Sequence, residues 1–105
     1  MDIGNIMQHA QQMQAKLIQI QQELGKKTVQ GSAGGGMVTV TVNGRGEVLA
    51  IAIEKEMITL KDAGMMQDLL VAATNDGLRR ARELKGQAMG KLTGGMNIPG
   101  LTDLF

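Results

Sequence analysis

The sequence predicts an α+β fold of the order α-β-β-β-α, in which two long helices flank a three-stranded antiparallel meander. The first observation is a period-two alternation of apolar and polar residues over residues 38–53, which is typical of half-buried strands. The second is the helical spacing of apolar residues on both sides of this stretch, over residues 3–24 and 61–90. A chain of 105 residues has room for one modest core, so we expect a single domain over residues 1–105.

Residues 3–27 are predicted to form the first helix. Its apolar residues recur at alternating spacings of three and four, the a and d positions of three heptads. They are Ile3, Ile6, Ala10, Met13, Leu17, Ile20 and Leu24. At ~1.5 Å per residue, this helix is ~40 Å long and extends beyond a sheet whose strands are ~20 Å long. Some of the apolar residues of this helix must therefore pack against another helix, in this chain or in a second copy.

The sheet is predicted over residues 28–53. A weaker first strand covers Thr28–Ala33, and three glycines at 34–36 form the turn into a longer hairpin. Alternating apolar residues give that hairpin one large apolar face, which needs a cover. These residues are Val38, Val40 and Val42 in its first strand and Leu49, Ile51 and Ile53 in its second.

Two registers of the hairpin are possible. A four-residue loop, Gly44–Glu47, pairs Val42 with Leu49, and the same register sets Val40 opposite Ile51 and Val38 opposite Ile53. A two-residue turn at Asn43-Gly44 would instead set Val40 against Glu47. We expect the first register because it buries more apolar surface.

The second long helix is expected over residues 60–90, and the spacing of Thr59 and Asp62 resembles a capping box at its start. Residues 94–105 are predicted to form a flexible tail, which could dock on a neighbour.

Small residues form a stripe on this second helix. Ala73, Gly77 and Ala81 recur at four-residue intervals and would let another backbone approach closely. Close packing explains a glycine that costs ~1 kcal/mol relative to alanine inside a helix. Together the helices carry more apolar surface than one small sheet can use, so we infer a homodimer.

The residue types argue against catalysis, a metal site or a cofactor. The chain has no cysteine, and its single histidine, His9, lies among glutamines on the first helix, where we expect a surface residue. The glycine cluster 34–36 lies between two strands, and residues 90–93 lack the glycine and hydroxyl spacing of a phosphate-binding loop. We therefore expect no enzyme and no small-molecule substrate.

Neither a secretory signal nor a membrane helix is visible in the sequence. The longest apolar run, residues 48–53, is far shorter than the ~20 residues that a membrane helix needs. We therefore expect a cytoplasmic protein without a membrane partner.

Charge is unevenly distributed along a chain whose net charge is only +1. Segment 54–78 is acidic, whereas segment 79–91 is basic. The basic segment contains Arg79, Arg80, Arg82, Lys85 and Lys91 against a single acidic residue, Glu83. Charge alone leaves two interpretations open: a solvated helix face with cations near a helix C-terminus, or a patch that binds phosphates.

Four segments carry a resemblance to a known family. They are GSAGGG at 31–36, VTVTVNGRGEV at 38–48, DLLVAATNDGL at 68–78 and KLTGGMNIPGL at 91–101. In these segments, and over essentially its whole length, the chain resembles the YbaB/EbfC family of bacterial nucleoid-associated proteins. The resemblance implies a cytoplasmic, nucleoid-associated homodimer that holds paired helices apart like tweezers. It also implies binding of double-stranded DNA, with effects on DNA conformation, nucleoid organisation and gene expression.

The resemblance attributes DNA contact to the first and last helices. The DNA-binding residues it implies are Arg79, Arg80, Arg82 and Lys85 on the last helix and Lys16 on the first. From its residue type we also expect Gln12 on the first helix to add a neutral hydrogen bond to the nucleic-acid backbone. The competing hypothesis is a protein–protein scaffold, in which the helix seam and methionine-rich surface bind another protein and DNA binding is incidental.

Overall fold

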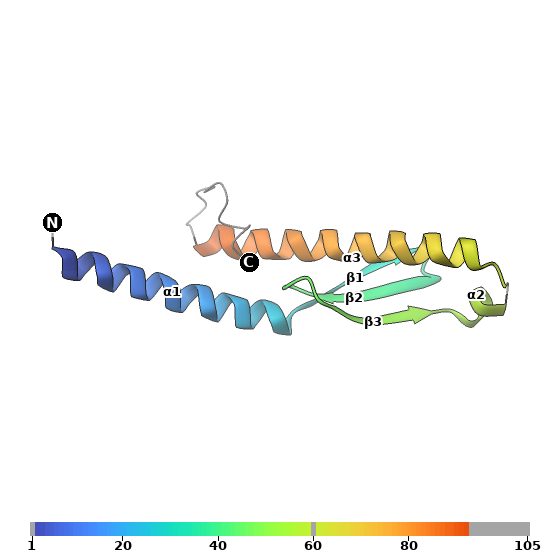
Figure 1. Cartoon of the computed structure of the whole chain (residues 1–105), viewed down its shortest axis with the longest axis horizontal. Coiled ribbons are helices and arrows are strands. Elements are labelled where there is room, and N and C mark those ends of the chain that lie inside the picture. The colour runs from blue at the N-terminus through green and yellow to red at the C-terminus, as the bar shows by residue number, and fades with distance from the viewer. Residues whose placement is uncertain (1, 60, 93–105) are drawn as a thin grey trace.

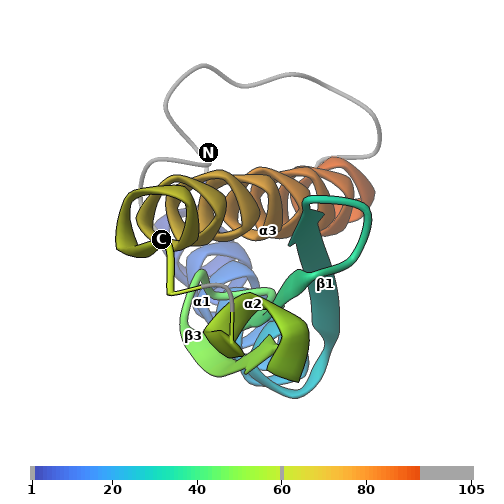
Figure 2. The ribbon, with the colours of Figure 1, turned by 90° about the vertical axis from the view of Figure 1, so that its right-hand side faces the viewer.

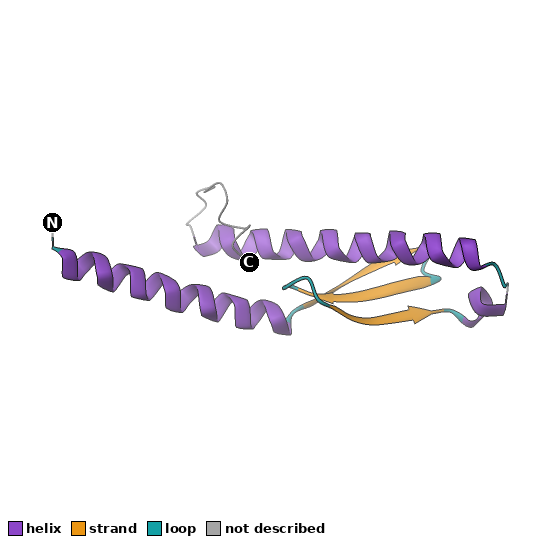
Figure 3. Cartoon of the chain, viewed as in Figure 1, coloured by secondary structure: helices purple, strands orange, loops and turns teal. Residues whose placement is uncertain are grey.

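The computed structural model describes residues 2–59 and 61–92 and confirms the predicted α+β class (Figure 1, Figure 3). Its elements are α1 (Ile3–Lys26), β1 (Thr28–Ala33), β2 (Val38–Asn43), β3 (Val48–Ile53), α2 (Lys55–Thr59) and α3 (Ala63–Leu92). The short helix α2 was not predicted, and the tail expected at 94–105 lies outside the described residues. The molecule is a rod of 68 × 22 × 17 Å.

The sheet is antiparallel throughout, in the order β1-β2-β3. The expected pairs Val38–Ile53 and Val40–Ile51 are confirmed, and so is the four-residue loop between β2 and β3. The third expected pair is wrong, because a bulge between Thr41 and Val42 sets Val42 opposite Val48 instead of Leu49.

Helix α3 lies across one face of the sheet and covers β1 and β2 (Figure 2). The valines of β2 are fully buried against the small residues of α3, which is the close approach that the small-residue stripe predicted. The core cluster consists of Val38, Val40, Val42, Ala73 and Ala81. A β-carbon at Gly77 would lie 2.8 Å from Cγ2 of Val42 and 3.4 Å from the amide nitrogen of Gly31.

Strand β3 lies beyond the cover that α3 provides. The sequence predicted that its apolar residues share the covered face, but Leu49 and Ile51 remain about half exposed. The physical reason is that a single helix spans β1 and β2, while α1 reaches the sheet only near its C-terminal end. An apolar strip on β3 is therefore left open.

The start of α3 differs from the predicted capping box. The Asp62 carboxylate accepts a hydrogen bond from the Met65 amide at 3.0 Å and so caps the helix. The Thr59 hydroxyl instead donates to the Glu56 carbonyl at 2.8 Å, at the end of α2. The expected partnership of Thr59 and Asp62 is wrong because a separate helical turn precedes α3.

The direction of α1 is fixed at its C-terminal end by the β2–β3 loop. The Gly44 amide donates to the carbonyls of Leu24 at 2.8 Å and Lys27 at 3.0 Å. The side-chain amide of the buried Asn43 donates to the Gly25 carbonyl at 3.4 Å. From this anchor α1 projects away from the sheet and beyond the end of α3, and its residues 3–16 are exposed (Figure 1).

Candidate nucleic-acid interface

Asp76 organises the arginine cluster of α3. Its carboxylate accepts from Arg79 Nη2 at 2.7 Å, from Arg80 Nε at 3.2 Å and from the Ser32 amide of β1 at 3.1 Å. Arg79 also donates to Glu83 Oε1 at 2.8 Å. Two of the four cations expected on this helix are thus held in ion pairs within the chain.

These contacts favour the charged forms of both partners. The Ser32 amide, and then the Arg79 and Arg80 side chains, hold the pKa of Asp76 below its ordinary value. The Asp76 carboxylate, followed by Glu83, raises the pKa of Arg79. Exposed ion pairs of this kind contribute little stability, so both arginines can exchange a carboxylate for a phosphate at small cost.

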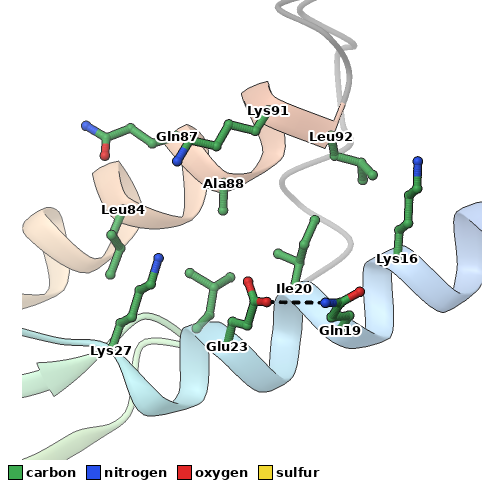
Figure 4. Close-up of a pocket in the computed structure, with 11 residues that line it drawn as sticks. Lys16, Gln19, Ile20, Glu23, Lys27, Leu84, Gln87, Ala88, Lys91 and Leu92 are labelled. Carbon is green, nitrogen blue, oxygen red and sulfur yellow. Dashed lines mark hydrogen bonds between the residues drawn. The ribbon is translucent and has the colours of Figure 1, made fainter.

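A groove of about 390 Å³ separates the C-terminal half of α1 from the end of α3 (Figure 4). Lys16 and Lys27 contribute to it from the α1 side, and Lys91 contributes from α3. Glu23 is the one acidic side chain in its lining, where it accepts from the Gln19 amide at 3.4 Å. The groove therefore carries net positive charge along both walls.

The groove continues toward the sheet as a shallower hollow between α3 and β1. Leu84 and Gln87 line both depressions, and the second is also lined by Arg80, Glu83, Val29 and Gln30. A polymer with regularly spaced phosphates could follow this surface from Arg80 to the lysines of the groove.

The remaining predicted site residues do not form one patch. Arg82 is exposed two residues before Leu84, which on a helix places it about 200° around α3 from the groove, and it makes no ion pair with another described residue. Lys85 is half-buried on α3, and Gln12 is exposed on the projecting part of α1.

Sequence reasoning missed Lys27 as a site residue and did not name Lys91 as one. Lys91 belongs to the basic segment 79–91, and this was the signal that could have found it. The sequence indicated only that Lys27 is a cation near a helix end. It lines the groove because of how α1 and α3 pack, which the sequence pattern does not show.

Other kinds of site find little support among residues 2–59 and 61–92. No group of three histidine, aspartate or glutamate side chains within these ranges is arranged to hold a metal ion. His9 is exposed on α1. No helix formed by the described residues is both long enough and apolar enough to cross a bilayer.

The fold and this surface define a small, elongated α+β protein that presents cationic and amide side chains from two helices around an open groove. The model of the YbaB/EbfC DNA-binding family matches residues 1–96. The chain belongs to this family.

Individual relatives agree with this assignment. A nucleoid-associated protein of Desulfotalea psychrophila is 59% identical over 105 residues, which cover 100% of this chain and 99% of that protein. A nucleoid-associated protein of Syntrophobacter fumaroxidans is 53% identical over 97 residues, which cover 92% of this chain and 88% of that protein. The crystal structure of an uncharacterized protein from Helicobacter pylori superposes with a TM-score of 0.80 at 28% identity, covering 90% of this chain and 99% of that one.

Proposed function

We propose that this chain is a non-enzymatic, nucleoid-associated protein that binds duplex DNA as a homodimer. The observation that carries the proposal is the groove between α1 and α3, where lysines from two helices face one another with a single acidic residue between them. Membership of a DNA-binding family and the names of its nucleoid-associated relatives support the same function. The site of action is the bacterial cytoplasm, on the nucleoid.

The phosphate contacts are assigned to both helices. Those predicted from the sequence are Arg79, Arg80, Arg82, Lys85, Lys16 and Gln12, and Lys27 and Lys91 extend the set. Amines, guanidinium groups and amides of this kind contact the DNA backbone and fix orientation without reading sequence. The protein then affects DNA conformation, nucleoid organisation and gene expression through binding that depends little on base sequence.

The homodimer is assigned to the open side of β3. Ile51 of β3 lies beside Leu70 and Val71 of α3 in a shallow apolar depression, which also includes Thr74 and Asn75. Ile51 is 50% exposed and Val71 61% exposed. An unpaired strand edge beside such a surface favours association with a second copy, which would hide both the edge and the side chains. A two-fold axis would also double the number of phosphate contacts.

A titration of labelled duplex at several salt concentrations tests the proposal. Binding through phosphates predicts that log K falls linearly with log salt, with a slope of about −0.9 for each contact. Unrelated duplexes of equal length should bind alike, because the contacts do not read bases. Absence of binding even at ~50 mM salt, where phosphate contacts are strongest, would contradict DNA binding.

The second candidate function is the protein–protein scaffold, and the projecting part of α1 is the observation that favours it. Ile3, Ile6 and Met13 lie on the heptad seam of this helix and are exposed. Such a seam can pack on a helix of another protein. The same titration separates the two functions, since a scaffold without DNA binding would give no salt-dependent signal.

A further inference from the structure

The groove between α1 and α3 has an apolar floor beneath its lysine rim. Ile20, Leu84 and Ala88 are half-buried and offer apolar surface to whatever lies in the groove, whereas the neighbouring Leu24 is already buried (Figure 4). A DNA backbone would use the rim but would gain nothing from this floor, because its contacts are charged and hydrated. The floor fits an apolar occupant that carries a negative charge.

We propose that residues 96–105 of the same chain bind in this groove. The segment reads MNIPGLTDLF, so half of its residues are large apolar ones. They are Met96, Ile98, Leu101, Leu104 and Phe105. Its single charged residue, Asp103, is acidic, whereas the groove has three lysines and one glutamate. Apolar side chains match the floor and Asp103 matches the rim.

The reach of the chain allows this assignment. The segment follows closely after Leu92, which itself lines the groove, and Gly94 and Gly95 permit a sharp reversal of direction. The groove extends along α1 from Lys16 to Lys27, which at ~1.5 Å per residue is ~16 Å. Ten extended residues span up to ~33 Å, so the segment can cover the whole groove.

The consequence of docking rests on the proposed function. A segment bound in the groove covers Lys16, Lys27 and Lys91, which are also assigned to phosphates. The tail and DNA therefore compete for one surface, and each weakens the binding of the other by the same factor.

Cysteine crosslinking in the full chain tests the docking without DNA. The chain has no cysteine, so two introduced thiols are the only ones present. One variant combines Leu104→Cys with Ala88→Cys in the groove. The matched control combines Leu104→Cys with Gly86→Cys, because Gly86 lies two residues earlier on α3, about 200° around the helix, where an added β-carbon meets no atom within 4 Å.

Docking predicts that the disulfide to position 88 forms at least ~10-fold faster than the disulfide to position 86, because a bound tail raises the local thiol concentration. Adding Asp103→Lys should reduce the ratio of the two rates of disulfide formation, because it replaces the charge that matches the lysines of the groove. Equal rates at the two positions would overturn the proposal. A disulfide that joins two chains, seen as a covalent dimer on a non-reducing gel, would overturn the assignment to the chain's own groove.

The competition is tested with the same Ala88→Cys, Leu104→Cys protein. The oxidised form should bind duplex several-fold more weakly than the form treated with reductant, and the control pair should show no such difference. Equal affinity in both redox states would overturn the competition. Absence of DNA binding in both states would overturn it together with the proposed function, whereas the crosslinking ratio reports on docking alone.

Discussion

Gly31 in β1 lies directly against Gly77 in α3, and a β-carbon built on Gly31 would lie 2.6 Å from the Gly77 Cα atom. The atoms that block a side chain here belong to the α3 backbone, so no rotamer change can make room. This contact sets the distance of α3 from the sheet. The position of every cation on α3 relative to α1 and β1 depends on it.

Substitution of the two glycines should have unequal effects on stability. Gly31→Ala should lower the free energy of unfolding by more than ~3 kcal/mol, because it forces backbone away from backbone. Gly77→Ala meets a Val42 methyl at 2.8 Å but gains ~1 kcal/mol of helix propensity, so its net loss should be only ~1 kcal/mol. Denaturant unfolding of both variants measures this, and equal losses would contradict the account.

Asp76 should make stability depend on acid pH. Because its pKa is lowered in the folded state, its contribution is fully present above its ordinary value of 3.8 and is lost as the pH falls through the folded pKa. Asp76→Asn should therefore flatten the decline in unfolding free energy below about pH 4, where the wild type loses this contribution. Unfolding curves between pH 2 and 7 measure the effect. Parallel declines in the two proteins would show that the contacts of Asp76 with Ser32, Arg79 and Arg80 do not lower its pKa in the folded state.

Releasing the arginines should strengthen DNA binding. Asp76→Asn removes the carboxylate that pairs with Arg80 and leaves Arg79 paired with Glu83 alone, so the salt slope should steepen by about 0.9 for each arginine that gains a phosphate, with Arg80 the first to do so. Asp68→Asn is the control, since it changes the net charge equally at an exposed position of α3 without an ion pair to a described residue. Identical slopes in the two variants would show that Asp76 does not restrain the arginines.

The proposed dimer interface can be tested by one charge on α3. Val71→Glu should give a monomer in light scattering, because it places a carboxylate in the apolar depression beside Ile51. Ile18→Glu serves as the control, because Ile18 is 51% exposed on α1, away from this depression. A dimer that survives Val71→Glu, or one lost equally in both variants, would exclude this surface as the interface.

Local patterns predicted the elements of the fold well. The alternation around Val40 and Ile51 predicted the hairpin register, and the spacing of Ala73, Gly77 and Ala81 predicted a close backbone approach. These succeeded because strand and helix periodicities are set by the backbone itself. The pairing of Val42 and the separate helix α2 were not predicted, because a bulge and a single helical turn leave no periodic signal.

The candidate site was harder to predict than the fold. Clustered charge identified Arg79 and Arg80, but not the carboxylate of Asp76 that holds both of them. Lys27 and Lys91 are 64 positions apart, and only the packing of α1 against α3 brings them to one groove. Such groupings depend on tertiary contacts, which one sequence does not reveal.

The most direct test of DNA binding by the α1–α3 groove compares two double variants in the duplex titration. Lys16→Gln with Lys91→Gln removes two cations from the groove, and Lys55→Gln with Lys61→Gln removes two exposed cations outside it. The groove variant should have a salt slope shallower than wild type by about 1.8 for each protomer that contacts the duplex, and the control should keep the wild-type slope. Equal slopes in the two variants would contradict the account.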